Sequence, residues 1–495
     1  MNYISTRGGK DNVSAAGAIK QGLAHDGGLF MPESIPDLDS QDIAELCEMS
    51  YPERAAYILS RFLTDYSYEE LLEDCTAAYS PERFVGGAAP IHKLGDDTFV
   101  LELWHGPTSA FKDMALQIMP KLLSRALEKT GEERCAFILV ATSGDTGKAA
   151  LEGYRDVDGV KIMVFYPVDG VSRVQKLQMS TQLGDNVSVC AIEGNFDDAQ
   201  TGVKKIFGDT DMAKLLDENR VFLSSANSIN WGRLAPQIVY YVSAYCDLIN
   251  SGEIYAGEKI NVTVPTGNFG NIFAAFIAKQ MGLPINRLVC ASNRNNILTD
   301  FLSTGKYDRN RKFFTTMSPS MDILISSNLE RLLYVMSGCE NTAELMKKLA
   351  ADGCYTVDSE LKAKLDEHFT GLFCDEENTA AEIKRTFEND GYLIDTHTAV
   401  GLNCAKQYIS ANRDGLKMLV ASTASPYQFA SDVYHSITGK SPADELSALD
   451  ELSALTGTEI PYPLKDIDKR EIRFRTVIDK QDMPAKVLET LGIKQ

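Results

Sequence analysis

The sequence lacks the signatures of several enzyme classes. It has six histidines in 495 residues, and none lies in a metal-ligand spacing such as H-E-x-x-H, so no catalytic metal is expected. A G-x-S-x-G motif is absent, which argues against a serine hydrolase. The ten cysteines form no C-x-x-C pair and lie in apolar runs such as RCAFILV at 134–140. This scatter predicts buried free thiols in a reducing compartment instead of disulfides or a zinc site.

Basic clusters and long apolar runs are also missing. The formal net charge is −20 without any long Lys/Arg run, so neither nucleic acid nor an anionic membrane is expected as a partner. No segment approaches the ~20 apolar residues of a membrane span. The opening MNYISTRGGKDNVSAAG has no apolar signal core, and we expect a cytoplasmic protein. A small anionic substrate would need a locally positive pocket.

The chain is long enough for two or three domains. Residues 1–90 combine a glycine-rich opening with helical periodicity at 42–66 and 66–79, which predicts a small, mostly helical N-terminal domain. Residues 91–495 form a second region, predicted to contain two α/β subdomains. Within it, the charged helical sequence at about 300–390 indicates an insertion.

The second region alternates apolar strand patterns with helices. Six strands are expected, each ending in a Gly, Ser, Thr or Pro loop, within 135–147, 161–167, 186–194, 259–271, 287–293 and 416–426. Near-continuous apolar strands that alternate with helices are typical of an α/β fold with a parallel sheet. Ligands bind such sheets at the carboxyl ends of the strands, where these loops lie.

One lysine lies in an unusually apolar helix pattern, GPTSAFKDMALQ at 106–117. Pro107, Thr108 and Ser109 predict the helix start. Residues 112, 116, 119 and 123 form one row beside the apolar row 111, 115, 118 and 122, so Lys112 should lie against the buried side in the first turn. Burial and the helix dipole both favour the neutral amine, which can form a Schiff base with a carbonyl. The same pattern also fits a lysine whose stem lies over apolar surface.

Two strand-to-helix loops suggest anion binding. VPTGNFGN at 264–271 would offer a phosphate the backbone amides at a helix start, although a tight turn that needs glycine explains it too. ATSGDTGKAA at 141–150 resembles a nucleotide P-loop, but Thr142 replaces the first glycine and Ala149 the metal-binding hydroxyl. That loop suits a carboxylate, or is an ordinary turn.

Two further segments carry polar side chains. SSANSINWGR at 224–233 ends in Arg233, which suits a phosphate or carboxylate but equally a surface salt bridge. ASTASPY at 421–427 closes a strand with Ser422 and Thr423. A buried lysine, a phosphate seat and a carboxylate loop on one parallel sheet together indicate pyridoxal phosphate as cofactor.

Several sequence blocks, taken together, resemble those of one enzyme family. YISTRGG, GLAHDGGLFMPESIP, HGPTSAFKDMALQ, ATSGDTGKAA, NSINWGR, TGNFGN, SPSMDILISSNLERLL and DTHTAVG resemble, in order, blocks of the threonine synthase family. The resemblance runs nearly end to end and implies the tryptophan synthase β-like pyridoxal-phosphate fold. It implies a lyase that converts O-phospho-L-homoserine and water to L-threonine and phosphate by β,γ-elimination and replacement.

The resemblance also implies a role for each matching residue. Lys112 would hold the cofactor and move protons, and Thr423 would contact the pyridine nitrogen. The remaining assignments are Gly267, Asn268, Phe269, Gly270 and Asn271 for the cofactor phosphate, Ser143, Gly144, Asp145 and Thr146 for the substrate α-carboxylate, and Asn227, Ser228, Asn230 and Arg233 for the substrate phosphate.

One motif departs from the family. STASPYQF at 422–429 has Ser425 and Gln428 where STAHPAKF would place a histidine and a lysine. Two alternatives remain beside a threonine synthase: a pyridoxal-phosphate lyase or dehydratase of the same fold, and a non-catalytic relative that binds phospho-amino acids. The N-terminal blocks and SPSMDI favour threonine synthase, and the retained lysine and glycines favour an enzyme.

Overall fold

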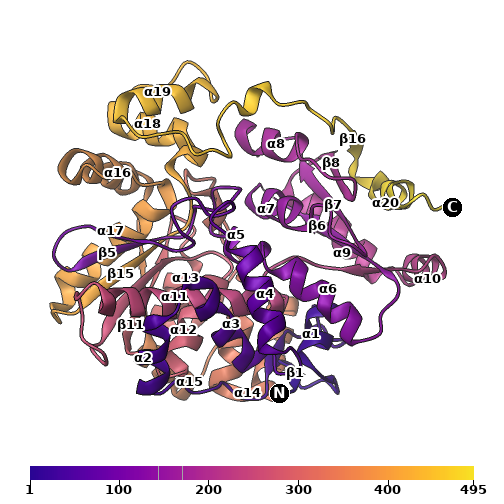
Figure 1. Cartoon of the computed structure of the whole chain (residues 1–495), viewed down its shortest axis with the longest axis horizontal. Helices are drawn as coiled ribbons and strands as arrows, with labels where there is room; N and C mark the ends of the chain where they lie inside the picture. The colour runs from indigo at the N-terminus through magenta and orange to yellow at the C-terminus, as the bar shows by residue number, and fades with distance from the viewer. Residues whose placement is uncertain (143, 170, 495) are drawn as a thin grey trace.

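Two sheets with mainly parallel strands lie side by side in the molecule (Figure 1). The computed structural model describes residues 1–142, 144–169 and 171–494. The larger sheet has the strand order β14-β11-β10-β15-β5-β4, and only its edge pair β4–β5 is antiparallel. Its strands are β4 (Ile91–Lys93), β5 (Thr98–Glu102), β10 (Ile260–Pro265), β11 (Ile285–Ser292), β14 (Phe369–Phe373) and β15 (Lys417–Ser422).

The second sheet has the order β16-β8-β7-β6-β9 and is parallel throughout. Its strands are β6 (Cys135–Ala141), β7 (Val160–Pro167), β8 (Val187–Glu193), β9 (Val221–Ser224) and β16 (Val477–Asp479). Its flanking helices are α7 (Asp145–Tyr154), α8 (Arg173–Ser180), α9 (Phe196–Gly208), α10 (Thr210–Glu218) and α20 (Met483–Leu491).

The apolar strands are buried on both faces. In β6, Phe137 and Leu139 pack in one hydrophobic cluster, whereas Ile138 and Val140 face another. Strands covered by helices on both sides need apolar residues at every position, which explains their near-continuous apolar sequence. All six predicted strands are present, and the α/β prediction with parallel sheets is confirmed.

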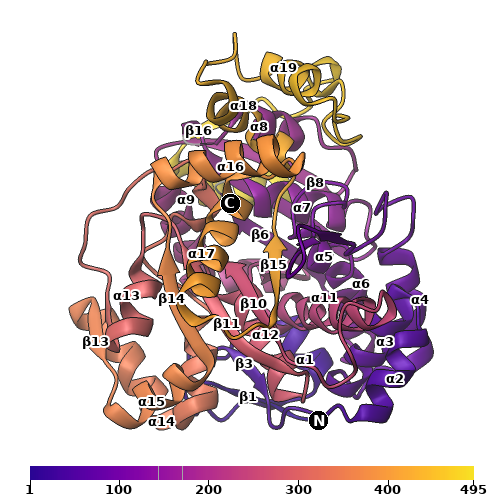
Figure 2. The ribbon, with the colours of Figure 1, turned by 90° about the vertical axis from the view of Figure 1, so that its left-hand side faces the viewer.

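Helices on opposite faces of the larger sheet separate its core into two layers (Figure 2). Leu288 and Cys290 of β11 pack with residues of α12, whereas Val289 and Ala291 pack with α17. The almost wholly buried α11 packs against α12. These helices are α11 (Trp231–Asn250), α12 (Gly270–Gln280), α13 (Ile297–Thr304) and α17 (Thr396–Asn412).

The N-terminal residues pack directly onto this core. The Tyr3 and Trp231 rings lie 5.7 Å apart between centroids, and Arg54 of α3 pairs with Asp247 of α11 at 2.6 Å. The helical pattern at 42–66 corresponds to two helices, because Ser50 and Pro52 begin a new helix, and the helix expected at 66–79 is present as a single helix. The elements are β1 (Tyr3–Ser5), β2 (Asn12–Val13), α1 (Ala15–Gln21), β3 (Phe30–Pro32), α2 (Ser40–Glu48), α3 (Tyr51–Phe62), α4 (Tyr68–Ala78), α5 (Asp113–Leu116) and α6 (Met119–Lys129).

The region at about 300–390 is mainly helical, as expected, but it also supplies edge strand β14 of the larger sheet. A Cβ on Gly371 in that strand would lie 2.9 Å from Thr299 Cα, so the sequence FTGLF carries a packing glycine where a β-branched residue would signal a strand. The elements are β12 (Lys306–Asp308), the 3-10 turn η1 (Pro319–Met321), α14 (Leu329–Asp352), β13 (Cys354–Thr356), α15 (Ser359–His368) and α16 (Glu376–Asp390).

The C-terminal part returns across the molecule to the second sheet, where β16 pairs with β8 (Figure 1). Its other elements are η2 (Pro426–Phe429), α18 (Ala430–Thr438), α19 (Ser447–Thr456), η3 (Ile467–Lys469) and η4 (Lys480–Asp482). Every helix in the described part of the chain is too short or too polar to cross a bilayer.

Candidate active site

Lys112 lies at the end of a segment that runs along the carboxyl end of β15. The Phe111 amide donates to the Thr423 carbonyl at 2.8 Å, and the Ser425 amide donates to Ser109 at 3.0 Å. The predicted helix start at 107–109 was too early, because α5 begins only at Asp113 and Lys112 is the residue before it. The Asp113 carboxylate accepts the Thr108 amide and hydroxyl at 2.8 Å each, and this turn delays the helix.

The Lys112 amine is largely withdrawn from solvent. Its side chain is 12% exposed, and Nζ lies 3.2 Å from Asp145 Oδ2. Burial lowers the pKa of Lys112; Asp145 opposes this effect, whereas the cations Arg233 and Lys148 reinforce it. The prediction that Lys112 lies beside the buried side of its segment is therefore confirmed, and its pKa is lower than that of an ordinary lysine.

The turn 267–271 after β10 is fixed by hydrogen bonds to its carbonyl groups. Ser326 Oγ donates to Gly267 O at 2.7 Å, and the amide and side chain of Asn328 both donate to Asn268 O at 3.0 Å. A Cβ on Gly267 would lie 2.7 Å from Ser320 O, so close approach requires this glycine. The left-handed residue is Phe269, with φ of 64°.

The start of α12 offers donors to an anion. Asn271 is 7% exposed, and its Oδ1 accepts the Tyr240 hydroxyl at 2.7 Å and that of Tyr241. Its buried Nδ2 has no hydrogen-bond partner within the described residues. A buried donor beside the free amides of a helix N-terminus fits a phosphate group, as the cofactor requires.

In the loop 142–148, Ser143 lies outside the described residues. Gly144 has φ of 137°, and a Cβ there would lie 2.4 Å from the Gln175 side chain. Asp145 accepts Ser320 Oγ at 2.8 Å and Gln175 Nε2 at 3.0 Å. Burial raises the pKa of Asp145, but Lys112 and Lys148 outweigh it and hold that pKa well below its usual range. An ionised Asp145 side chain would repel a substrate carboxylate, so it supports the loop instead.

Arg233 is a buried guanidinium, not a surface salt bridge. It is 5% exposed, and its Nη1 donates to Ala226 O at 2.8 Å while Nη2 lies 3.5 Å from Thr146 Oγ1. No carboxylate within the described residues pairs with it, and burial lowers its pKa to about 10. A buried cation without a counterion is a strong candidate for binding an anionic ligand.

Asn230 serves a different purpose from its neighbour Arg233. Its Nδ2 donates to Ile19 O at 2.9 Å, and its Oδ1 accepts the Gly232 amide at 2.9 Å. Both ends of the side chain are therefore occupied in capping α11 and attaching α1. Asn227 and Ser228 remain half-buried at the same loop.

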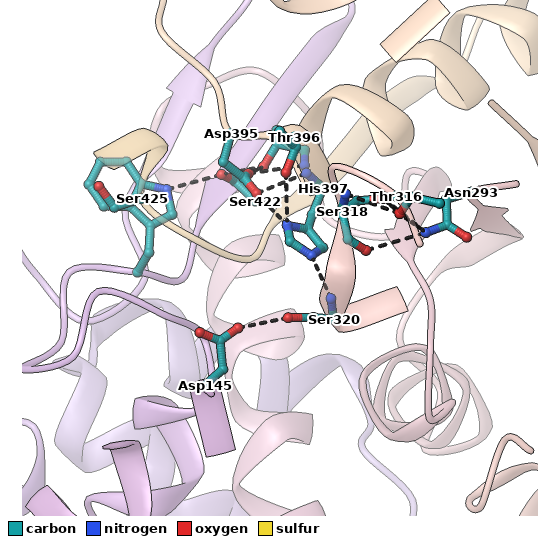
Figure 3. Close-up of polar contacts among 12 residues, drawn as sticks. Asp145, Asn293, Thr316, Ser318, Ser320, Asp395, Thr396, His397, Ser422 and Ser425 are labelled. Atoms are coloured by element: carbon teal, nitrogen blue, oxygen red, sulfur yellow. Dashed lines mark hydrogen bonds and ion pairs between the residues drawn. The ribbon is translucent and has the colours of Figure 1, made fainter. Parts of the chain in front are cut away.

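A polar network missed by sequence reasoning links the sheet to the loop at η1 (Figure 3). The Ser320 amide donates to His397 Nε2 at 3.1 Å, and His397 Nδ1 lies 2.8 Å from Asp395 Oδ2. Because Nε2 accepts, the ring proton belongs on Nδ1 and points to Asp395. Ser320 in turn holds Asp145, so this chain of contacts reaches Lys112. Short polar loops have no periodicity, and only the quoted blocks 318–333 and 395–401 signalled them.

A second missed network connects the N-terminal strands to the site. Asn328 Nδ2 donates to Ser228 Oγ at 3.0 Å. Arg331 is fully buried and donates to Ile229 O at 2.6 Å and Phe30 O at 3.2 Å. One residue before it, Glu330 receives Arg7 through two hydrogen bonds of 2.8 Å. The N-terminal residues thereby brace both the turn 267–271 and the Ser228 loop.

The two departures from the family motif both lie beside the Lys112 segment. Gln428 Nε2 donates to Thr108 O at 3.0 Å, and the Ser425 amide bonds Ser109 as described. Both residues are buried, as is the neighbouring Thr423. Ser425 and Gln428 therefore hold the backbone before Lys112.

Known protein families match this chain along most of its length. Family models described as "Threonine synthase N terminus", "Pyridoxal-phosphate dependent enzyme" and "Threonine synthase, C-terminal" match residues 2–79, 87–421 and 398–487. The threonine synthase of Pseudomonas aeruginosa is 39% identical over 449 residues, covering 90% of this chain and 92% of that protein. The chain belongs to the threonine synthase family.

A crystal structure of the threonine synthase family has the same fold. Pyridoxal-phosphate-bound threonine synthase from Brucella melitensis superposes with a TM-score of 0.88 at 36% identity, covering 99% of both chains. Human "Threonine synthase-like 1" is 42% identical over 427 residues, or 83% of this chain. The chain spans 56–60% of the length of the threonine synthase-like 1 relatives. The predicted fold class is confirmed.

Proposed function

We propose that this protein is a pyridoxal-phosphate-dependent threonine synthase acting on O-phospho-L-homoserine. One observation carries the proposal: a protein of net charge −20 buries the Arg233 guanidinium, which pairs with no carboxylate among the described residues, near Lys112, whose amine pairs with Asp145. Such a buried excess of positive charge calls for anionic ligands. A phosphorylated cofactor and a phosphorylated amino acid supply them.

The cofactor would be held at three points. Residues 267–271 would take its phosphate, Lys112 its aldehyde and Thr423 its ring nitrogen. When bound, pyridoxal phosphate supplies an aldehyde that joins an amine and a ring that withdraws electrons from the adjacent carbon. The Asn271 amide without a partner among the described residues and the start of α12 support the phosphate assignment.

Lys112 would also move protons. Burial lowers the pKa of Lys112 from that of an ordinary lysine, which favours the neutral amine that can take a proton from the substrate and return it. Asp145 Oδ2 accepts both Lys112 Nζ at 3.2 Å and Ser320 Oγ at 2.8 Å. Asp145 therefore orients the amine, and Ser320 orients Asp145.

The substrate phosphate would lie beside Arg233. Thr146, Asn227 and Ser228 lie around this guanidinium or on its loop and can add hydrogen bonds. The substrate α-carboxylate would take backbone amides of the loop that contains Ser143 and Gly144. Since the Asp145 side chain is an anion, only its amide suits a carboxylate.

The proposal extends to the cellular location, the partner and the domain boundaries of the protein. All ten cysteines are free thiols, which favours the cytoplasm. The expected partner is the small-molecule substrate. We further propose residues 1–90 as an N-terminal domain and 91–495 as the catalytic region.

Phosphate release tests the function. The protein loaded with pyridoxal phosphate should release phosphate from O-phospho-L-homoserine and form threonine, whereas Lys112→Ala should lose nearly all activity and its borohydride-sensitive visible absorbance. Lys279→Met, at the far end of α12, is the matched lysine control. Turnover of threonine or serine instead would identify a dehydratase, and absence of both absorbance and turnover would favour a binding protein.

A further inference from the structure

A second lysine is buried beside Lys112. Lys148 lies in the first turn of α7, and its side chain is 1% exposed. Its Nζ lies 3.0 Å from Asp145 Oδ1, three residues earlier on the same helix face. Neither the phosphate seat nor the substrate groups proposed above use this ammonium.

Asp145 divides its two oxygens between the two lysines. Oδ1 faces Lys148 at 3.0 Å, and Oδ2 faces Lys112 at 3.2 Å. Gln175 and Ser320 add one neutral hydrogen bond to each oxygen. The carboxylate therefore keeps a cationic partner whichever lysine changes its state.

This arrangement answers an electrostatic difficulty. If Lys112 were the sole partner of Asp145, loss of its charge would leave a buried carboxylate unpaired, which is strongly unfavourable. The carboxylate would then hold Lys112 in its charged form. A second cation removes this coupling and also repels a charge on Lys112.

We propose that Lys148 is the second ion-pair partner of Asp145 and thereby allows Lys112 to act as a neutral amine. Lys148 is a positioning residue, because it acts through Asp145 and Lys112 instead of touching the substrate. The inference rests on the proposed function, which requires Lys112 to lose its proton.

The charged groups around the pair come from three elements. Asp145 and Glu152 lie on α7 with Lys148, Asp113 begins α5 after Lys112, and Arg233 lies on α11. Arg233 and Lys148 both act on Lys112, and Lys148 and Glu152 both act on Asp113. The variants below therefore change Lys148 and leave the other groups in place.

The test measures the titration of the Lys112 amine in the full-length chain. Competitive acetylation across neutral and alkaline pH, followed by peptide mass spectrometry, gives the midpoint at which Lys112 becomes reactive. Removal of the neighbouring cation in Lys148→Met should raise that midpoint by about one pH unit or more. Lys148→Arg keeps the charge and should stay near wild type, and Lys279→Met should not change it.

The loaded enzyme gives a second readout. The acid limb of the pH profile of kcat/KM should move upward in Lys148→Met by the same amount as the acetylation midpoint. An unchanged midpoint in Lys148→Met, or an equal shift in Lys148→Arg, would overturn the proposal, since the charge would then not matter.

Folding provides a further outcome. If Lys148→Met is insoluble, the double variant Asp145→Asn/Lys148→Met should restore a folded chain, because it removes the buried carboxylate that Lys112 alone would otherwise have to balance. Failure of the double variant to fold, while Asp145→Asn folds, would contradict the counterion role. Acetylation needs neither cofactor nor substrate. Absent phosphohomoserine turnover would therefore reject the proposed function alone, and an absent shift with normal turnover would reject only the role of Lys148.

Discussion

Two buried aspartates near Lys112 are held in opposite ways. Asp113 is bound by the Thr108 amide and hydroxyl, and burial raises its pKa to about 7. Asp145 lies between two lysines, and its pKa falls well below the usual range. Hydrogen bonds from the neutral residue Thr108 hold the Asp113 carboxyl, whereas ion pairs with Lys112 and Lys148 hold the Asp145 carboxylate.

The same contrast separates the two halves of the site. The turn 267–271 has its carbonyl groups bound by Ser326 and Asn328, so its amides are aimed before any ligand arrives. Arg233 makes one short hydrogen bond and no ion pair within the described residues. The first half is preorganised by geometry, and the second half holds uncompensated charge that a ligand would neutralise.

Loss of the Arg233 guanidinium should lower activity more than any other change considered below. A small effect would contradict the view that Arg233 holds uncompensated charge for a ligand. Arg233→Gln removes the buried guanidinium, and we expect kcat/KM for O-phospho-L-homoserine to fall about 100-fold, as for a lost charged hydrogen bond. The visible absorbance of the bound cofactor should be unchanged. Arg233→Lys keeps the positive charge but not the two-pronged guanidinium, and its kcat/KM should lie between those of the wild type and Arg233→Gln. An equal loss of cofactor absorbance would show that Arg233 belongs to the other half.

The hydrogen-bonded half is tested by Asn328. Asn328→Ala removes the side-chain donor to Asn268 O and Ser228 Oγ and leaves only the backbone amide on Asn268 O, so the dissociation constant for pyridoxal phosphate should rise about tenfold. Equilibrium titration of the visible absorbance measures it. Asn328→Asp keeps the acceptor for Arg331 but not the donors, and it should resemble the alanine variant. An effect confined to KM for the substrate would contradict this assignment.

The segments proposed to bind ligands were easier to predict from the sequence than the residues that support them. Lys112, the turn 267–271 and Arg233 were predictable because a lysine in an apolar row and glycines after a strand have direct chemical meaning. Ser320, His397, Asn328 and Arg331 were not, since their roles depend on contacts between segments far apart in the chain, such as Ser320 with His397 at 3.1 Å. Asn230 caps a helix, and a capping asparagine and a ligand-binding one look alike in sequence.

A smaller effect is expected at His397. His397→Leu leaves the half-buried Ser320 amide without an acceptor, which should misplace Ser320 and Asp145 and lower kcat about fivefold. His397→Gln offers an oxygen to the same amide and should recover part of the loss, whereas a purely space-filling role would favour leucine. The kcat values of the two variants, measured at saturating substrate, decide between these roles.

The smallest effect on activity is expected at Asp113, where stability should respond instead. Its folded pKa of about 7 lies above the value of 3.8 for an ordinary aspartate, so the folded state binds the proton more tightly. Its contribution to the free energy of unfolding is therefore complete at acidic pH and declines as pH rises through about 7. Asp113→Asn keeps a neutral acceptor for Thr108 and removes this decline.

Urea unfolding of wild type and Asp113→Asn at several pH values measures the difference. It should grow in favour of asparagine from about pH 4 to about pH 7 and then level off at about 2–4 kcal/mol. A difference that grows toward acidic pH would mean that Asp113 is held as an anion, like Asp145. The two aspartates would then be held in the same way, and the contrast between hydrogen-bonded and charge-paired halves would lose its clearest example.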